Sequence, residues 1–599
     1  MAPERLREEG NYLFSKGEYH LAVDKYSAYI ESVADRDDYS KAKKPELVFG
    51  YSNRAQGYLM LEEYSKALED AENALRLDPT HLKSWVRKAK AFGGMKFHQQ
   101  AVWAYKTVLR DFKDQLHKTN LQELLESLKA AEKMDRMTRL GRYEDGIDEY
   151  WDVASNVSEP PLMEEYVGPV EIKLTAATGR GLFATRDLLP GELLFVSNSM
   201  ITVRVPFEDN EASRNLSQLA LFEAIKRRVQ NAKLEALEDF TRLQFLVQVA
   251  ALGGSYPTES LLRDCPSMRY FTPLNGLSSK DRKITDDDRT HPALDTDFSD
   301  EMLRRIVEKR QFSHWGTNNE ELNGLYSLPC LMNHSCVPNV AVTTMQNRTI
   351  SKLFRAGRNI KKGDELVYAY YNINCPLDAR RAFFPSLCCR CARCELEETL
   401  LAEVQPLKSL ASQCNKFWEE RPTLQGLTQE ERHRKRNQCL ICLNLLKDLL
   451  DSRLAFLTEI QKDMVRASFI RFNRLLHEPA LSIAIQDCTR VDIEHEIALI
   501  SVAVKAMNNV QPGSEIALAM ISGIYYRVKR STLSQEEDEF VGLKEIHRLG
   551  IEIIRILNGP HLKNQTVGKL FSYASLIRGV LGDGGSLLAT GLLFHSSGD

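Results

Sequence analysis

Four cysteines lie close together past the middle of the chain, at positions 388, 389, 391 and 394. Thiolates are soft metal ligands, and in a chain where we expect no secretion signal such a group favours a metal site over disulfides. Zinc takes four ligands in a tetrahedron. If three of these closely spaced thiolates bind the ion, a fourth ligand must come from elsewhere. Sparse cysteine use in the rest of the chain fits a reducing compartment, and we expect a cytoplasmic or nuclear protein, or one found in both.

Two further segments carry polar and aromatic residues that could act on a substrate. The first contains Asn333-His334-Ser335-Cys336, and the second, about thirty residues later, runs from Gly363 to Tyr370. Taken alone, a lone histidine is more often a structural residue, and tyrosines at 368, 370 and 371 are more often strand residues packed in a core. Only the presence of both segments in one chain therefore indicates a functional site.

Together these segments resemble the SET-domain protein lysine methyltransferases. The sequence Cys389-Arg390-Cys391-Ala392-Arg393-Cys394 follows them closely and matches the C-x-C-x-x-C post-SET pattern of that family. The resemblance implies a zinc ion held by Cys336, Cys389, Cys391 and Cys394. The competing explanation is a chance grouping of ordinary buried thiols, and Cys388 is an extra neighbour that could compete as a ligand.

The same resemblance implies S-adenosylmethionine as the methyl donor. It assigns the cofactor to the backbone of a glycine-containing turn and to polar groups of the two later segments. These residues are Gly179, Arg180, Gly181, Asn333, His334 and Tyr370. One departure is Leu387, which stands where related proteins often carry an aromatic residue stacked on adenine; Phe383 or Phe384 could substitute for it.

Methyl transfer to a lysine amine moves positive charge from sulfur to nitrogen, so such an enzyme mainly aligns donor and acceptor. The amine must arrive deprotonated from a pKa near about 10.4, and a narrow aromatic channel disfavours its charged form. By resemblance, Tyr370 places the amine, and Tyr326, Tyr368 and Tyr371 are candidate channel walls. We therefore expect catalytic roles for Tyr370, Tyr326 and Tyr368.

The first 115 residues contain an internal repeat. Ala55, Tyr58 and Ala67 recur 34 residues later as Ala89, Phe92 and Ala101, a period typical of tetratricopeptide repeats. An earlier copy near Gly10 makes three repeats, and the helical pattern from Leu116 to Met137 reads as a capping helix. Such arrays are all-helical and bind protein partners.

This block resembles the co-chaperone type of repeat, in which five polar side chains on the first helices clamp the terminal carboxylates of a peptide. The matching residues are Arg7, Asn11, Asn53, Lys83 and Arg87. Lysine, arginine and asparagine supply the donors that two carboxylates need. The implied partner is the acidic C-terminal tail of a cytosolic heat-shock chaperone. A generic scaffold with solvated charges is the alternative, and Arg7 replaces a more usual lysine.

The fold class expected from these patterns is multi-domain α+β. All-α repeats are followed by a small-strand β SET domain with a helical insertion and a post-SET zinc segment, and then by an all-α domain. The insertion has one cysteine, Cys265, so the zinc-binding MYND module of the related SET-MYND proteins is absent. The expected boundaries are repeats at 1–138, linker at 139–166, SET parts at 167–205 and 323–374, insertion at 206–322, zinc segment at 375–398 and C-terminal domain at 399–599.

Composition limits the other function classes. The 599 residues carry 79 Lys and Arg against 82 Asp and Glu, a net charge of -3, so we expect no direct nucleic-acid binding. The apolar tract from Gly584 to Phe594 is too short for a bilayer, so we expect no membrane association. In the C-terminal third, apolar periodicity predicts helices that end near Pro512 and Gly559. Cys439 and Cys442 read as packing residues.

The sequence thus predicts an S-adenosylmethionine-dependent protein-lysine N-methyltransferase that acts on a histone or non-histone protein and recruits partners through its repeats. One rival is a non-catalytic adaptor with a degenerate SET domain. Another is a chromatin-binding protein with little turnover, for which the chain offers no concentrated basic patch.

Overall fold

The structure is a computed structural model that describes most of the chain and divides it into two compact units, one up to Arg142 and one from Tyr143 onward. The described residues are 3–35, 43–143, 147–148, 150, 163–175, 179–206, 216–227, 299–310, 312–315, 320–346, 350–371, 373–383, 389–408, 410, 428–470, 490–530 and 542–576. No helix within these ranges is both long and apolar enough to cross a membrane.

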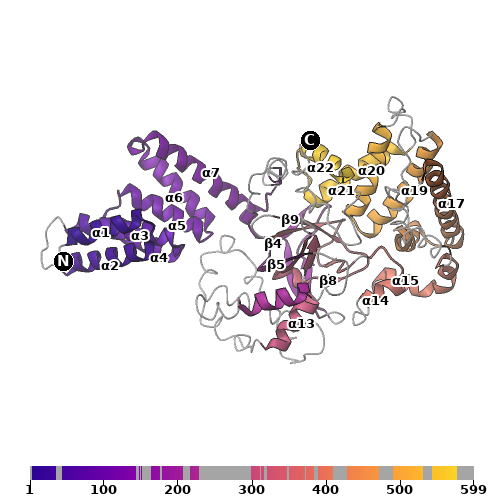
Figure 1. Cartoon of the computed structure of the whole chain (residues 1–599), viewed down its shortest axis with the longest axis horizontal. Coiled ribbons are helices and arrows are strands. Elements are labelled where there is room, and N and C mark those ends of the chain that lie inside the picture. Colours follow the sequence, from indigo (N-terminus) through magenta and orange to yellow (C-terminus); the bar gives the residue numbers. More distant parts are fainter. Residues whose placement is uncertain are drawn as a thin grey trace. The chain divides into compact units, whose positions relative to one another are not determined.

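The first unit consists of three antiparallel helix pairs and a final long helix, which confirms the predicted all-α repeats (Figure 1). The helices are α1 (Pro3–Ser15), α2 (Tyr19–Ala34), α3 (Lys43–Met60), α4 (Tyr64–Leu77), α5 (Leu82–Gly94), α6 (His98–Asp111) and α7 (Lys118–Leu140). Small residues let these helices approach closely: a Cβ on Gly10 would lie 2.6 Å from the ring of Tyr26. The alanines of the repeat, such as Ala67 and Ala101, are fully buried.

The second unit contains three sheets built from short strands, as predicted for the SET region. The first has the order β1 (Tyr166–Val167), β4 (Leu193–Asn198), β10 (Ile350–Ala356), β9 (Val340–Gln346), and the second β2 (Val170–Thr175), β3 (Gly179–Ala184), β11 (Glu365–Tyr368), β8 (Asn333–His334). Strand β10 is buried along its whole length, and Phe354 stacks on Phe195 of β4 at 4.4 Å. Strands separated by about 160 residues are therefore neighbours in one core.

The third sheet occupies part of the stretch predicted to be a helical insertion. Its order is β5 (Ile201–Pro206), β7 (Glu320–Leu325), β6 (Phe312–Trp315). The segment of β7 is rich in acidic residues and contains glycine, so its local sequence does not indicate a strand. Pairing with β5 over six residues decides its conformation instead.

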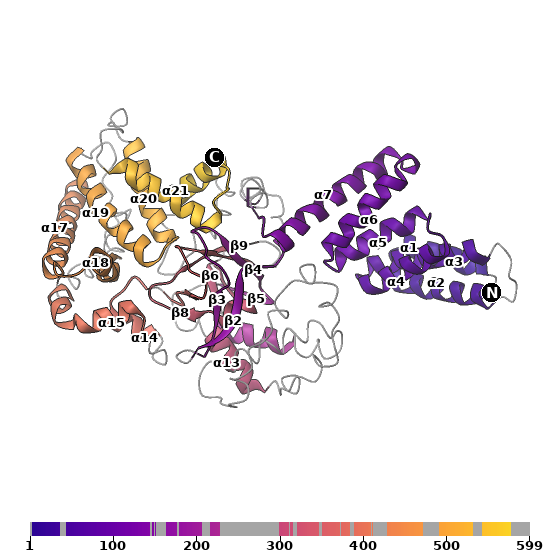
Figure 2. The ribbon, with the colours of Figure 1, turned by 180° about the vertical axis from the view of Figure 1, so that it is seen from behind.

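Two helices of the insertion pack on the same core as the strands. They are residues 216–227 and α13 (Asp300–Arg310), whose buried side chains include Phe222 and Ile306. In both ribbon views α13 lies at the opposite end of the strands from α21 (Leu543–Asn558) and α22 (Asn564–Leu576) (Figures 1 and 2). The predicted helix beyond residue 227 lies outside the described residues, as does Cys265.

The C-terminal third is helical, as predicted. Its remaining described helices are α17 (Gln429–Arg453), α18 (Glu459–Arg466), α19 (Arg490–Val510) and α20 (Glu515–Arg530), and the preceding zinc segment contains α14 (Leu377–Phe383) and α15 (Ala392–Thr399). Helix α19 ends just before Pro512 and α21 just before Gly559, at the predicted stop signals. Helix α21 packs against β9 and β10, and the Thr343 hydroxyl donates to the Leu557 carbonyl at 2.6 Å. Strands and C-terminal helices thus share an interior.

The segment expected to be a linker contributes to this interior as well. Tyr143, Ile147 and Met163 are buried. The Tyr143 hydroxyl donates to the Glu164 carbonyl, and the Thr566 hydroxyl of α22 donates to Asp148. The described residues from 143 to 166 are therefore packed within the second unit, because their apolar side chains find partners there, whereas residues 139–142 end the first unit.

Candidate functional site

Four cysteine side chains converge at the end of the strand region. The sulfur atoms of Cys336, Cys389, Cys391 and Cys394 all lie within 4.8 Å of one another. Cys336 follows β8, whereas the other three precede α15 or lie in its first turn. The Cys336 and Cys394 sulfurs are 3.6 Å apart, close to the ~3.8 Å expected for two sulfurs bound to one tetrahedral zinc.

This donor set fits zinc, and within the described residues it is the single group of side chains that could hold a metal ion. Cys336 joins the cluster because β8 carries it there, although it precedes the other three by more than fifty residues. Cys388, the possible competitor, lies outside the described residues. Cys439 packs among leucines of α17, as expected for a packing residue.

Strand β8 runs parallel to β11, and this pairing assembles the remaining candidate residues. Asn333 lies opposite Val367, and His334 lies opposite Tyr368. The side chain of Asn339 bridges the two segments: its amide nitrogen donates to the Glu365 carbonyl, and its oxygen accepts from the Val367 N–H, both at 2.8 Å. A side chain that replaces two backbone partners fixes the register of these strands.

His334 connects this strand pair to the cysteine cluster. Its Nδ1 accepts from the Tyr370 backbone N–H at 3.1 Å, and its Nε2 lies 3.3 Å from the Cys336 sulfur. Burial lowers the pKa of His334 to about 4, so the ring is neutral near pH 7. With Nδ1 as acceptor, the single proton resides on Nε2 and points at the sulfur.

The ring of His334 also stacks on Tyr371, with centroids 4.6 Å apart. The Tyr370 hydroxyl donates to the Met332 carbonyl at 2.6 Å, and the Tyr370 ring lies 5.0 Å from that of Tyr368. The structure therefore brings Tyr368, Tyr370 and the adjacent Tyr371 close to His334. It holds Tyr370 at its backbone and at its hydroxyl.

Tyr326 lies in a different environment. It is almost fully buried, in a small cluster with Leu322 and Ile350, and burial raises the pKa of its hydroxyl well above the usual value. The ammonium of Lys352 lies over its ring, 5.6 Å from the centroid. No described contact places Tyr326 beside Tyr370, so its predicted role as a channel wall stays a prediction.

The glycine-containing segment, expected to be a turn, instead forms the start of strand β3 and meets Asn333 there. The Asn333 amide nitrogen donates to the Arg180 carbonyl at 3.0 Å and to the Glu365 carboxylate at 2.7 Å. A Cβ on Gly181 would lie only 2.5 Å from that carboxylate oxygen, so a side chain at this position would displace Glu365 from its bond to Asn333. Gly179 begins β3. The predicted cofactor residues of three separate segments are thus contiguous.

In the first unit, the five predicted peptide-binding residues lie on the first helix of each pair. Arg7 and Asn11 are one turn apart on α1, Asn53 lies on α3, and Lys83 and Arg87 are one turn apart on α5. The Asn53 amide donates to the Asn11 side-chain oxygen at 3.3 Å, and the Tyr26 hydroxyl donates to the same oxygen at 2.9 Å. These bonds fix the orientation of the Asn11 amide.

The positive charges of these five residues, which we call the candidate peptide groove, also converge. Burial raises the pKa of the Tyr26 hydroxyl, and the charges of Arg87 and Arg7 oppose that rise, so both guanidinium groups lie near one phenol. Burial lowers the pKa of Arg87 to about 10, which leaves it charged near pH 7. Its side chain donates to Ser52 and to Gln56 of α3. Lys83 is exposed.

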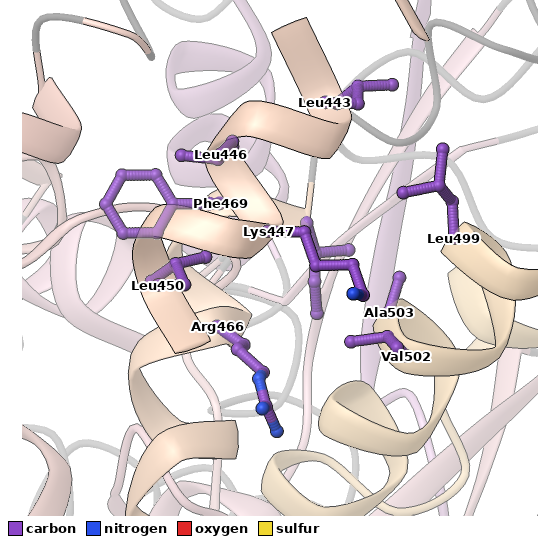
Figure 3. A pocket seen from close by; sticks show the side chains of 10 residues that line it. Leu443, Leu446, Lys447, Leu450, Arg466, Phe469, Leu499, Val502 and Ala503 are labelled. Atoms are coloured by element: carbon purple, nitrogen blue, oxygen red, sulfur yellow. The ribbon is translucent and has the colours of Figure 1, made fainter. Parts of the chain in front are cut away.

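A cavity among α17, α18 and α19 has a different character (Figure 3). Its volume is about 40 Å³, enough for no more than a few water molecules. Figure 3 shows leucines of α17 on one side and Leu499, Val502 and Ala503 of α19 on the other, with Lys447 and Arg466 as its charged lining residues. It is a packing defect of the helical core rather than a binding site.

Several residues that organise the site were not singled out from the sequence. Asn339 and Glu365 orient β11 and Asn333, and the Met332 carbonyl receives the Tyr370 hydroxyl. Asn339 and Glu365 lie within the two recognised motifs, so their position was a signal for these two. Phe384 and Leu387 lie outside the described residues, and of Phe383 only the backbone is described.

Comparison with protein families gives two matches. Residues 179–371 match the SET domain, and residues 48–81 match the tetratricopeptide repeat. The chain therefore combines a tetratricopeptide-repeat region with a SET domain. The SET match begins at the glycine-containing segment and ends at Tyr371, so it encloses the strands that carry Asn333, His334 and Tyr370.

Comparison with curated proteins finds relatives over short segments. The chain is 32% identical over 127 residues to human tetratricopeptide repeat protein 12, which is 20% of this chain and 16% of that protein. It is 36% identical over 106 residues to serine/threonine-protein phosphatase T of Trypanosoma brucei brucei, 18% of this chain and 20% of that protein. It is 28% identical over 160 residues to human DnaJ homolog subfamily C member 7, 27% of this chain and 29% of that protein. The chain thus spans less than a third of each.

Among solved structures, one match is the second tetratricopeptide domain of human RPAP3 in complex with an HSP70 peptide, at 23% identity and a TM-score of 0.18, covering 22% of this chain and 99% of that chain. Another is the Hsp90 co-chaperone Cns1 of Saccharomyces cerevisiae, at 20% identity and a TM-score of 0.20, covering 32% of this chain and 63% of that chain.

Proposed function

We propose that this protein transfers a methyl group from S-adenosylmethionine to the side-chain amine of a lysine in a protein substrate. The observation that supports this most is the parallel pairing of β8 with β11, which gathers Asn333, His334, Tyr368 and Tyr370. Strand β3, which begins with the glycine-containing segment, lies on the other side of β11. In a degenerate SET domain without catalytic activity, we would not expect all of these groups to be retained in one place.

The residues proposed to hold the cofactor are the backbone of Gly179 to Gly181 with Asn333, His334 and Tyr370. S-adenosylmethionine would supply an activated methyl group there. Gly181 lies beside this group, because the side chains of Glu365 and Asn333 occupy the space that a Cβ at this position would need. Asn333 anchors the arrangement, since its amide bonds both the Arg180 carbonyl and Glu365.

Tyr370 is the residue proposed to place the substrate amine. Its hydroxyl proton is committed to the Met332 carbonyl at 2.6 Å, so the phenolic oxygen presents its lone pairs as an acceptor for an amine N–H. The neighbouring Tyr368 ring adds an aromatic surface. Such a surface favours the neutral amine that the reaction requires.

We further propose that Cys336, Cys389, Cys391 and Cys394 hold zinc as a structural ion. Zinc in this position would fix the chain on both sides of the strand pair, because Cys336 follows β8 and the other three follow β11. Reduced thiols persist in the cytosol and nucleus, which is where we place the protein.

For the first unit we propose recruitment of a protein partner through a peptide that ends in carboxylates. Arg7, Lys83 and Arg87 supply positive charge, and Asn11 and Asn53 supply amides on a rigid scaffold. The acidic C-terminal tail of a heat-shock chaperone has this chemistry. The groove alone would also serve a non-catalytic adaptor, which is the second candidate function.

Calorimetric titration of S-adenosylmethionine into zinc-loaded protein tests the enzyme proposal without a known substrate. We expect micromolar binding that is lost in Asn333→Ala. Asn198→Ala is the matched control, because Asn198 also donates to a backbone carbonyl, that of Met163, but lies on β4. Absence of binding to the wild type would favour the adaptor.

A further inference from the structure

Two arginines lie fully buried beside the cysteine cluster. Arg380 of α14 and Arg393 of α15 both have side chains with no exposed surface. They share one carboxylate: the Glu397 oxygen Oε1 is 3.1 Å from Arg380 and 2.9 Å from Arg393. Arg380 also lies 3.8 Å from the Cys394 sulfur. Arg393 contacts the carbonyls of Ile373 at 2.9 Å and Cys336 at 3.5 Å.

Ser468, which follows α18, completes this network. Its hydroxyl accepts from Arg393 at 2.8 Å and from Arg380 at 3.3 Å, and it donates to Glu397 at 2.9 Å. Ser468 is buried. The network therefore joins the cysteine segment to the helices of the C-terminal third at a single hydroxyl.

The charges of this network do not cancel. Two guanidinium groups and one carboxylate leave one positive charge in the interior. The buried pair Arg436 and Glu496, elsewhere in the same unit, is balanced one to one at 2.8 Å. An unbalanced buried charge is costly, so a negative counterpart is expected next to it.

The cysteine cluster supplies that counterpart when it binds a divalent ion. Metal ligation requires thiolates, and four thiolates around a divalent ion carry a net charge of about -2. The guanidinium of Arg380 reaches one ligand sulfur, and that of Arg393 reaches the backbone of another ligand. Groups just outside the ligands commonly orient a metal centre in this way.

We propose that Arg380 and Arg393 are positioning residues of the metal centre. Through Ser468, the packing of α18 depends on whether the metal site is occupied. The arginines balance the charge of the four-thiolate zinc site, and the docking of the segment after α18 depends on that balance. This inference rests on the zinc site of the proposed function. It does not depend on methyl transfer.

The first test is zinc affinity, measured by competition with a chromophoric chelator. Arg393→Met and Arg380→Met should bind zinc at least tenfold more weakly than the wild type. Arg381→Met is the matched control, because Arg381 lies on the same helix but forms an exposed pair with Glu398; it should change nothing. Arg393→Lys keeps the charge and should recover part of the affinity. Equal affinity in all variants would overturn the proposal.

A second test uses the wild-type protein and avoids variants that fail to fold. Hydrogen exchange of α18 should quicken when zinc is removed, whereas α4 in the repeats should not change. Ser468→Ala should quicken exchange in α18 with zinc still bound. If α18 is equally protected from hydrogen exchange with and without zinc, the proposed link between the metal site and α18 is refuted. A wild type that binds no zinc would instead refute the zinc site itself, and calorimetry of S-adenosylmethionine reports separately on the enzyme.

Discussion

The candidate peptide groove and the SET centre place polar residues in different ways. In the groove, each residue lies on a helix that its own repeat specifies, and its charge faces solvent or a neighbouring polar group. In the SET centre, the half-buried residues 180, 333 and 365 bond one another across three strands, and the buried residues 394 and 468 contact the neighbouring cysteine and arginine network, so polar groups find their partners on distant segments. A substitution in the groove should therefore affect peptide binding alone, whereas a substitution in the SET centre should also disturb residues on neighbouring segments.

The largest effect should follow loss of a zinc ligand. Cys391→Ser should abolish bound zinc and strongly lower the unfolding temperature of the second unit, because metal binding in such sites contributes on the order of 10 kcal/mol. The repeats should melt as before. Metal analysis with calorimetric unfolding checks both statements, and Cys442→Ser, outside the cluster, should behave as the wild type. A shift in the melting of the repeats would break the comparison.

The next largest effect should come from Tyr370→Phe. Removing the hydroxyl takes away the acceptor proposed for the substrate amine, so the rate of methyl transfer should fall about 100-fold while the fold persists. Tyr143→Phe is matched, since that hydroxyl also donates to a backbone carbonyl. It should cost about 1 kcal/mol of stability and no activity. Equal rates for Tyr370→Phe and the wild type would remove Tyr370 from the mechanism.

Changes in the groove should be smaller and confined to partner binding. The double variant Lys83→Ala, Arg87→Ala should weaken binding of an acidic C-terminal peptide by more than about tenfold, because charge-assisted bonds to carboxylates are lost. Added salt should weaken wild-type binding in the same direction. Fluorescence anisotropy of a labelled peptide measures both. As a control, Lys66→Ala removes a positive charge from α4 and should leave peptide affinity intact. Retained affinity in the double variant would show that the groove does not bind the peptide.

The smallest effect concerns the buried Lys352, whose ammonium donates to the Thr344 hydroxyl at 3.1 Å. Burial lowers its pKa from 10.5 to about 8, with Glu515 opposing the shift. The unfolded chain therefore binds more protons between pH 8 and 10.5, and stability should rise with pH in that window. The expected gain is about 1–2 kcal/mol between pH 7.5 and 9.5.

Chemical denaturation across this pH range checks the prediction by comparison with Lys352→Met. The variant should lack this part of the pH dependence, whereas contributions from other titrating groups cancel in the difference. Parallel stability curves for the two proteins would show that Lys352 does not titrate as the structure indicates.

The same contrast explains which features the sequence could predict. The repeats follow from a period of small and aromatic residues. Three members of the cysteine cluster are close in sequence, and the resemblance to the SET family supplied the fourth, Cys336. Strand β7 could not be predicted from its own residues, since pairing with β5 decides it. Nor could the network of Arg380, Arg393, Glu397 and Ser468, because nothing local shows that these residues will be buried together.

One measurement tests the central claim most directly: parallel calorimetric titrations of S-adenosylmethionine and of an acidic C-terminal peptide into zinc-loaded and zinc-depleted protein. His334 joins the cofactor strand to Cys336 at 3.3 Å, so we predict that zinc depletion abolishes cofactor binding and leaves peptide affinity unchanged. Cofactor binding that survives zinc depletion, or that is absent from the zinc-loaded protein, would contradict the account.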